Sequence, residues 1–188
     1  TRLNFTGGSV GAAPTSSDFI NGWLEFINPD DVDIRLLING GETAVAVQLQ
    51  MKTVAETRAD CVALLDMPRA SVDSVTDMLT FRNTTPNFNS HYCAIYVPWL
   101  QIWDRFNNVL VEVPPSGYVA SQCAFNDFVG NPWDAPAGFT RGILNIIKPT
   151  KVFTQGERDT MYPAQINPIQ MFRGEGNVIW GQKTEQAK

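Results

Sequence analysis

The 188-residue chain is poor in the residue types that mark enzymes, metalloproteins and nucleic-acid-binding proteins. It contains a single histidine, His91, and three cysteines. Its 14 basic residues are outnumbered by 19 acidic ones, which gives a net charge of −5. Because nucleic-acid phosphates and anionic lipid surfaces both require a basic face, the sequence predicts neither a nucleic acid nor a membrane as a partner.

The cysteines argue against a disulfide framework and against a zinc or redox site. There are three cysteines, an odd number: Cys61, Cys93 and Cys123. Each lies in an apolar segment, and no two have C-x-x-C spacing. We therefore expect buried free thiols, as in proteins of a reducing cytosol. The longest apolar run, at 92–100, is interrupted by Pro98 and is far too short to span a bilayer.

What the chain does contain is the composition of an ordinary globular domain. Hydrophobic residues make up 44% and charged residues 18%, which suits a single domain over residues 1–188 with a substantial core. The chain begins at Thr1 without Met and ends at Lys188 with no obvious stop, so we expect a fragment of a longer protein.

Apolar runs and amphipathic stretches alternate along the chain. Helical periodicity is found at 15–27, 42–58, 71–83, 117–128 and 155–162. Strand-like runs fall at 32–38, 61–68, 92–97, 108–113 and 142–147, and segments 166–172 and 178–184 predict a C-terminal β-hairpin. This alternation predicts an α/β fold whose mostly parallel central sheet is flanked by helices and joined by right-handed crossovers.

Several hydroxyl side chains are placed to cap these helices. Ser16 or Ser17 would cap the first helix, Ser71 the third and Thr154 the last. The segment 98–108 contains an Asn-Asn pair and is interpreted as a connection that includes a turn.

The stretch "VEVPPSGYVASQ", residues 111–122, raises the hypothesis of a serine hydrolase with Ser116 as its nucleophile. The chain order Asp66, His91, Ser116 matches one known triad order. However, the first glycine of a nucleophile elbow is missing. Asp66 and Ser116 follow predicted strand ends whereas His91 precedes a strand, so His91 should lie roughly 15–20 Å away. We expect Ser116 to cap the following helix instead.

The remaining polar and aromatic clusters are ambiguous or weak. Asp30, Asp31 and Asp33 lack the pattern of a calcium loop and are interpreted as a solvated turn. Trp99, Trp103 and the loop residue Trp133 fit either a carbohydrate or partner surface or core packing at strand ends. The glycine-rich stretches match neither a phosphate loop nor a dinucleotide motif. We therefore predict no catalytic, cofactor-binding or metal-binding residues.

Read together, short motifs resemble the contractile tail sheath proteins of bacteriophages. In order they are "YVPW" (96–99), "VPPSGYVA" (113–120), "NPWDAPAGFTRG" (131–142), "INPI" (166–169) and "VIWGQKT" (178–184), preceded by "GGSVG" (7–11). The sequence departs from the family pattern in two places: Ser121 stands where Gly is usual, and Phe125-Asn126-Asp127 stands where Arg-Thr-Asp is usual.

The resemblance implies a structural protein rather than an enzyme. Its fold would be the subtilisin-like sheath domain without protease activity, in a fragment that lacks the C-terminal domain. The full-length subunit would pack with copies of itself in helical hexameric rings around the tail tube protein, above a baseplate. Contraction would drive the tube through the host envelope for genome ejection.

The same resemblance implies a location and leaves one alternative open. The protein would be made in the bacterial host cytoplasm and would belong to the virion, as part of the phage tail. The fragment alone would be monomeric. A related sheath of a phage-like secretion or bacteriocin machine would carry the same motifs.

Overall fold

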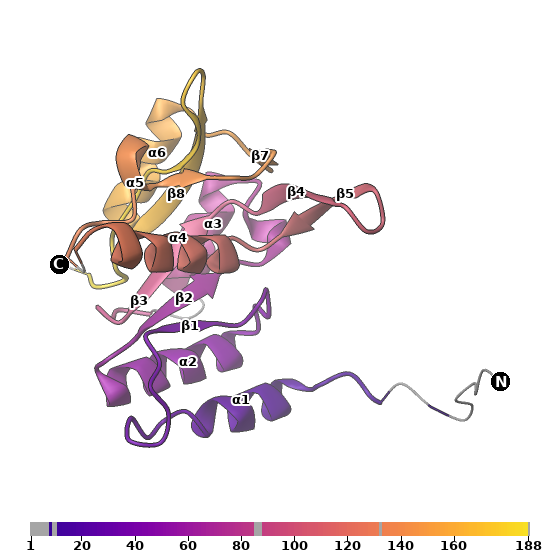
Figure 1. The fold of residues 1–188 in the computed structure, drawn as a ribbon, viewed down its shortest axis with the longest axis vertical. Coiled ribbons are helices and arrows are strands. Elements are labelled where there is room, and N and C mark those ends of the chain that lie inside the picture. The colour runs from indigo at the N-terminus through magenta and orange to yellow at the C-terminus, as the bar shows by residue number, and fades with distance from the viewer. Residues whose placement is uncertain (1–7, 9–10, 85–87, 132, 188) are drawn as a thin grey trace.

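A computed structural model describes residues 8, 11–84, 88–131 and 133–187, and it has a mixed α/β architecture (Figure 1). A six-stranded sheet has the order β1-β2-β3-β8-β9-β6. Its strands are β1 (Leu36–Ile38), β2 (Val62–Asp66), β3 (Cys93–Val97), β8 (Ile166–Phe172), β9 (Gly176–Ile179) and β6 (Ile143–Leu144). The pairings from β1 to β8 are parallel, and β9 runs antiparallel to both β8 and β6.

A second, three-stranded antiparallel sheet projects from the body of the molecule (Figure 1). It has the order β5-β4-β7, with β5 at Val109–Val113, β4 at Leu100–Asp104 and β7 at Lys148–Pro149. Strands β4 and β5 form a hairpin in which Trp103 pairs with Leu110. The prediction that 98–108 is only a connection is wrong, because Leu100–Asp104 forms strand β4.

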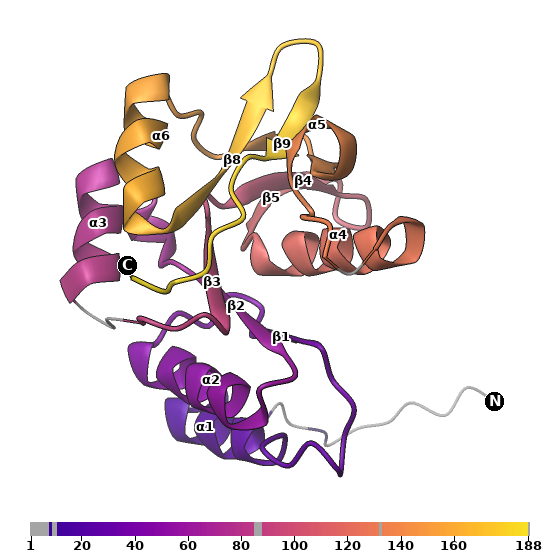
Figure 2. The same cartoon turned by 90° about the vertical axis from the view of Figure 1, so that its left-hand side faces the viewer.

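The helices cover the six-stranded sheet on both faces (Figure 2). They are α1 (Ser16–Leu24), α2 (Val45–Arg58), α3 (Val75–Thr84), α4 (Ser116–Val129), α5 (Gly138–Arg141) and α6 (Gln155–Met161), with single 3₁₀ turns at Arg69–Ser71 and Tyr162–Ala164. Helix α4 lies on one face and α2, α3 and α6 lie on the other, while α1 packs outside α2.

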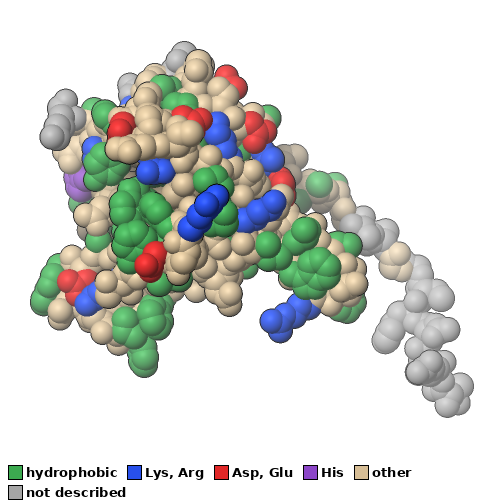
Figure 3. All heavy atoms as spheres, turned by 90° about the horizontal axis from the view of Figure 1, so that it is seen from above, with side chains coloured by type: hydrophobic (Ala, Val, Ile, Leu, Met, Phe, Trp, Pro, Cys, Tyr) green, Lys and Arg blue, Asp and Glu red, His purple; other side chains and the backbone are tan. Residues whose placement is uncertain are grey.

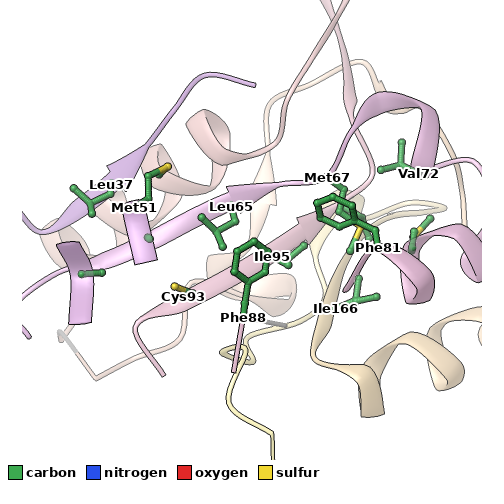
Figure 4. Close-up of a cluster of buried hydrophobic side chains, with 14 of the residues drawn as sticks. Leu37, Met51, Leu65, Met67, Val72, Phe81, Phe88, Cys93, Ile95 and Ile166 are labelled. Carbon is green, nitrogen blue, oxygen red and sulfur yellow. The ribbon is translucent and has the colours of Figure 1, made fainter. Parts of the chain in front are cut away.

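The strand period of two divides the core into two clusters, one on each face of the sheet. Leu65 and Ile95 belong to the larger cluster, with side chains from α2, α3 and α6 (Figure 4). Their neighbours Leu64 and Ala94 point to the opposite face and pack with Val119 of α4. Nearly continuous apolar strands are therefore required here, because both faces are buried.

Most predicted elements are present, but some caps and boundaries differ. Thr154 caps α6 in a reciprocal capping box with Glu157, as predicted for its hydroxyl. The cap of α1 is Thr15 rather than Ser16 or Ser17, because Thr15 exchanges hydrogen bonds with Asp18.

Two further expectations need correction. Ser71 does not cap α3, since it lies in the preceding 3₁₀ turn and the backbone N–H of Asp77 instead reaches Ser74 Oγ. Of the strand expected over 32–38, only Leu36–Ile38 forms a strand, because only these residues pair with β2.

The C-terminal hairpin is confirmed and is continued by a docked segment, residues 181–187. The hairpin consists of β8 and β9. Beyond it, the chain passes alongside the start of β3, where the N–H of Glu185 donates to the carbonyl of Cys93 at 2.9 Å (Figure 2). Arg82 of α3 forms a buried ion pair with Glu185, with Nε 3.0 Å from Oε2. The second predicted strand therefore ends early, at Ile179.

Candidate functional site

The structure brings Asp66 and Ser116 together at the end of β2. Ser116 is the first residue of α4 and only 1% exposed, and Asp66 is fully buried. The Ser116 hydroxyl donates to Asp66 Oδ2 at 2.6 Å, and its backbone N–H donates to Oδ1 at 3.1 Å. The carboxylate of Asp66 therefore satisfies the N-terminus of α4, and the expectation that Ser116 itself caps the helix is wrong.

Burial raises the pKa of Asp66 to about 6, while hydrogen bonds from Ser116 and from the backbone of Gly41 act in the opposite direction. The main-chain carbonyl of Asp66 accepts a hydrogen bond from the Gln48 side chain at 2.7 Å. The junction thus ties β2 to the loop after β1, to α2 and to α4.

His91 lies at the opposite end of the sheet. Asp66 is paired in register with Tyr96 of β3, and His91 is five residues earlier in the chain. At about 3.3 Å per residue this places it roughly 16 Å away along the strand direction. The His91 ring packs on Tyr92, with 4.0 Å between centroids. Ser116 donates directly to the carboxylate, so the geometry of a triad, in which His stands between Ser and Asp, is not formed.

A shallow groove beside this junction has a volume of about 440 Å³. It is lined by Gly40, Val113, Pro114, Gly117, Tyr118 and Ser121. Its walls carry no carboxylate, imidazole or thiol. An acyl-transfer reaction there would have no base to activate the exposed Ser121 hydroxyl.

The acidic cluster after α1 is a turn. Asn28 Nδ2 donates to Asp31 at 2.8 Å, and the N–H of Asp30 donates to Asn28 Oδ1 at 3.2 Å. Within the described residues, no three His, Cys, Asp or Glu side chains are grouped to hold a metal ion. In the same part of the chain, no helix is long and apolar enough to cross a membrane.

The motifs that carry the family resemblance form structural joints. Asn167 of "INPI" is buried and donates to the carbonyls of Ile95 and Lys183, while its Oδ1 accepts from the Lys183 N–H at 2.7 Å. Gly181 of "VIWGQKT" passes so close that an added Cβ would lie 2.6 Å from Asn167 Oδ1. These contacts fix the segment 181–187 on the sheet.

The "NPWDAPAGFTRG" motif forms a second joint, between α4 and the loop that follows it. Arg141 donates to Asp134 at 2.6 Å and to Asn126 at 3.1 Å. Asn126 in turn donates to the Asp134 carbonyl at 2.7 Å. Gly130 leaves room for the Arg141 guanidinium, which a Cβ there would displace. Most of the earlier "GGSVG" motif lies outside the described residues.

The three tryptophans singled out in the sequence have different environments. Trp99 packs against the larger core cluster and donates to the Met67 carbonyl at 2.9 Å, so it is a packing residue. Trp103 and Trp133 are exposed, at 46% and 80%.

Trp103 and Trp133, two of the tryptophans considered for a partner surface, each belong to an exposed apolar surface whose other members were not predicted. The first, which we call the hairpin-tip surface, consists of Trp103, Phe106 and Leu110. The second, the helix-end surface, consists of Phe125, Phe128, Val129 and Trp133. The helical spacing of Phe125, Phe128 and Val129 could have predicted this surface from the sequence. These three residues share one face of α4, whereas Val119 and Asn126 are buried on another.

The comparisons with known proteins agree with the motifs. A family model described as the phage tail sheath protein central domain matches residues 12–185. The tail sheath protein of Enterobacteria phage T4 is 34% identical over 203 residues, covering 97% of this chain and 31% of that protein. The tail sheath protein of Vibrio phage KVP40 is 28% identical, covering 96% of this chain and 31% of that protein. The chain therefore spans about a third of the length of these two relatives.

Solved structures show the same fold. The contracted helical sheath of the anti-feeding prophage superposes with a TM-score of 0.68 at 19% identity, covering 95% of this chain and 46% of that one. The contracted sheath complex of the extracellular contractile injection system PVC gives a TM-score of 0.61 at 24% identity, covering 84% and 41%. At these identities the likeness concerns the fold alone.

Proposed function

The chain belongs to the phage tail sheath protein family, and from this premise we propose that it is the α/β body of a contractile sheath subunit. The observation that carries the proposal is the family match over residues 12–185, which includes every joint described above. The subunit is a structural protein and not an enzyme. The buried Asp66–Ser116 pair supports this, because it uses the hydroxyl for packing rather than for nucleophilic attack.

In this proposal, full-length subunits assemble as helical hexameric rings around a tail tube protein and above a baseplate. Contraction moves each subunit largely as a rigid body and drives the tube through the host envelope. The joints at Asp66, Asn167 and Arg141 support rigid-body behaviour, since each fixes a loop with buried or partly buried hydrogen bonds. The energy comes from a metastable extended assembly and requires no cofactor.

The finer features of the fold belong to the same proposal. Residues 1–188 act as one unit with a subtilisin-like arrangement around the parallel strands β1, β2, β3 and β8, and carry no catalytic, cofactor-binding or metal-binding residues. The protein is made in the host cytoplasm and functions in the virion. The segment 1–188 alone is monomeric, because it covers only 31% of its sheath relatives and stable sheath contacts in this proposal need the full-length subunit.

A sheath of a phage-like secretion or bacteriocin machine is the second candidate. The two solved sheaths with the same fold come from such contractile machines. The higher sequence identity to the tail sheath of a phage favours the virion. Genes for a capsid and a DNA-packaging enzyme next to this one would support the virion, and their absence would favour the machine.

Electron microscopy of the full-length protein tests the function. Purified subunits should form long helical tubes of uniform diameter, whereas the 188-residue chain should sediment as a monomer. A full-length protein that stays monomeric at high concentration would overturn the proposal. A fluorophosphonate probe should leave Ser116 unmodified, with Ser116→Ala as the matched control, and selective labelling of the unsubstituted protein would restore the hydrolase hypothesis.

A further inference from the structure

The hairpin-tip surface is a preformed projection. Phe106 at its tip is 94% exposed, and Trp103 and Leu110 lie side by side as a cross-strand pair. Asp104 orders the loop, because its Oδ1 accepts from the backbone N–H groups of Phe106 and Asn107 at 2.9 and 3.2 Å. A surface that is already ordered loses less conformational entropy when it binds.

The helix-end surface is likewise held in place. Phe128 and Trp133 are 88% and 80% exposed. The hydrogen bonds among Asn126, Asp134 and Arg141 fix the loop that carries Trp133 against the end of α4. Hydrophobic side chains also reach the surface in separate groups among the charged ones in the view from above (Figure 3).

The β4–β5 hairpin tip and the C-terminal end of α4 lie on opposite sides of the molecule (Figure 1). The chain runs from the hairpin tip back along β5 and then along α4 to its C-terminal end. Five residues of strand and 14 of helix separate the tip from the helix end. These lengths correspond to about 16 Å and about 21 Å. Because α4 continues away from the hairpin, the two surfaces do not contact each other within one copy (Figure 1).

The two surfaces have complementary charges beside their aromatic residues. Arg105 precedes Phe106 at the hairpin tip, and Asp127 precedes Phe128 on α4. Both charged residues are exposed, and neither takes part in an ion pair among the described residues. One surface thus offers a cation beside exposed aromatic rings and the other an anion beside exposed aromatic rings.

We propose that the hairpin-tip surface of one copy packs on the helix-end surface of a second copy, with Arg105 facing Asp127. This inference rests on the proposed function, because an open helical assembly requires two different, complementary faces on each subunit. Seven apolar side chains make a contact smaller than the roughly 1,200 Å² typical of stable complexes. The contact is therefore weak between two isolated domains and gains strength only when repeated along an assembly.

Charge reversal in the full-length protein tests the contact. Arg105→Glu and Asp127→Arg should each raise the protein concentration needed for tube formation at least about tenfold, because like charges would face each other. The double variant Arg105→Glu/Asp127→Arg should assemble at nearly the unsubstituted concentration. Arg173→Glu, an exposed reversal in the β8–β9 turn, should assemble normally. Unimpaired single variants, or a double variant no better than the singles, would overturn the contact.

Cysteine cross-linking separates this inference from the proposed function. A 1:1 mixture of the Phe106→Cys and Phe128→Cys variants, oxidised at high concentration, should give a disulfide-linked dimer at least about five times more abundant than either variant alone. If the unsubstituted protein forms tubes but the mixed cysteine variants give no cross-link, the contact is refuted and the proposed function stands. If the unsubstituted protein forms no tubes but the mixed cysteine variants give the cross-link, the proposed function is refuted and the contact is supported. If neither tubes nor the cross-link are observed, the proposed function and the proposed contact are both refuted.

Discussion

Replacement of Ser116 by alanine tests whether Asp66 is the buried acceptor at the start of α4. The substitution removes the hydroxyl that donates to Asp66 Oδ2 at 2.6 Å and leaves the backbone N–H bond to Oδ1. The site is too well packed for water to enter freely, since Ser116 is almost fully buried. One carboxylate oxygen is then left without its donor.

The loss of stability should depend on pH, because the pKa of Asp66 is about 6. At pH 8 the carboxylate is charged, and losing a hydrogen bond to a buried charge costs about 1.5–3 kcal/mol. At pH 5 the acid is mostly neutral, and the loss falls to about 0.5–1.5 kcal/mol. For a domain of this size, the lowering of Tm should be roughly 3–12 °C at pH 8 and about half as much at pH 5.

The same group sets a pH dependence in the unsubstituted protein. The pKa of Asp66 is raised from 3.8 to about 6, so the folded state binds more protons than the unfolded state in this window. The stability contributed by the neutral acid is complete below pH 3.8 and is lost as pH rises through 6. The shift corresponds to about 3 kcal/mol. Asp66→Asn should flatten this part of the stability curve.

Urea unfolding followed by tryptophan fluorescence at pH 5 and pH 8 provides the measurement. Ser121→Ala, on the exposed side of the same helix, is the matched control and should change stability little at either pH. If Ser116→Ala loses the same free energy of unfolding at pH 5 and pH 8, the charge of Asp66 does not change the strength of its hydrogen bond from Ser116. The reasoning would then be refuted.

Other joints give three further predictions. Burial raises the pKa of Glu185 to about 8, so Arg82→Met should cost about 3–5 kcal/mol in urea unfolding at pH 9, where the buried acid would be charged without its cation, and less at pH 6. Arg82→Met/Glu185→Gln should recover most of the loss at pH 9; a mild single variant there would argue against the pair. Gly181→Ala should cost about 1–3 kcal/mol and speed proteolysis of the last residues, because its Cβ collides with Asn167; unchanged proteolysis would contradict this. Cys61 and Cys93 are buried as expected, but Cys123 is only half-buried. Desolvation still raises the pKa of Cys123 to about 11, so its thiol should react slowly with a disulfide reagent in the folded protein; fast labelling would contradict the raised pKa.

Local patterns were sufficient for much of the fold. The continuous apolar runs of β2 and β3 are typical of strands buried on both faces, and Thr154 was correctly predicted to cap the last helix. Strand β4 was missed because its pattern depends on an antiparallel partner, β5, rather than on composition. The hairpin brings Trp103 opposite Leu110, and this pairing is not visible in either segment alone.

The candidate site shows what a sequence cannot supply. The separation of His91 from Asp66 was predicted correctly from strand ends, because parallel strands share their direction. The direct bond between Asp66 and Ser116 was not predicted, since it depends on a contact between residues 50 positions apart. The expected helix cap was therefore assigned to the wrong partner. The absence of catalytic residues stays a prediction.

The docked segment 181–187 has a mechanical consequence. It lies beside β3, near the middle of the six-stranded sheet, and is held by Asn167 and Arg82 from two different elements. A force applied to the chain at residue 187 would load these bonds together, in shear along the strand, rather than peel an edge strand open one bond at a time. The domain would then transmit tension from its C-terminal end directly to the centre of its core.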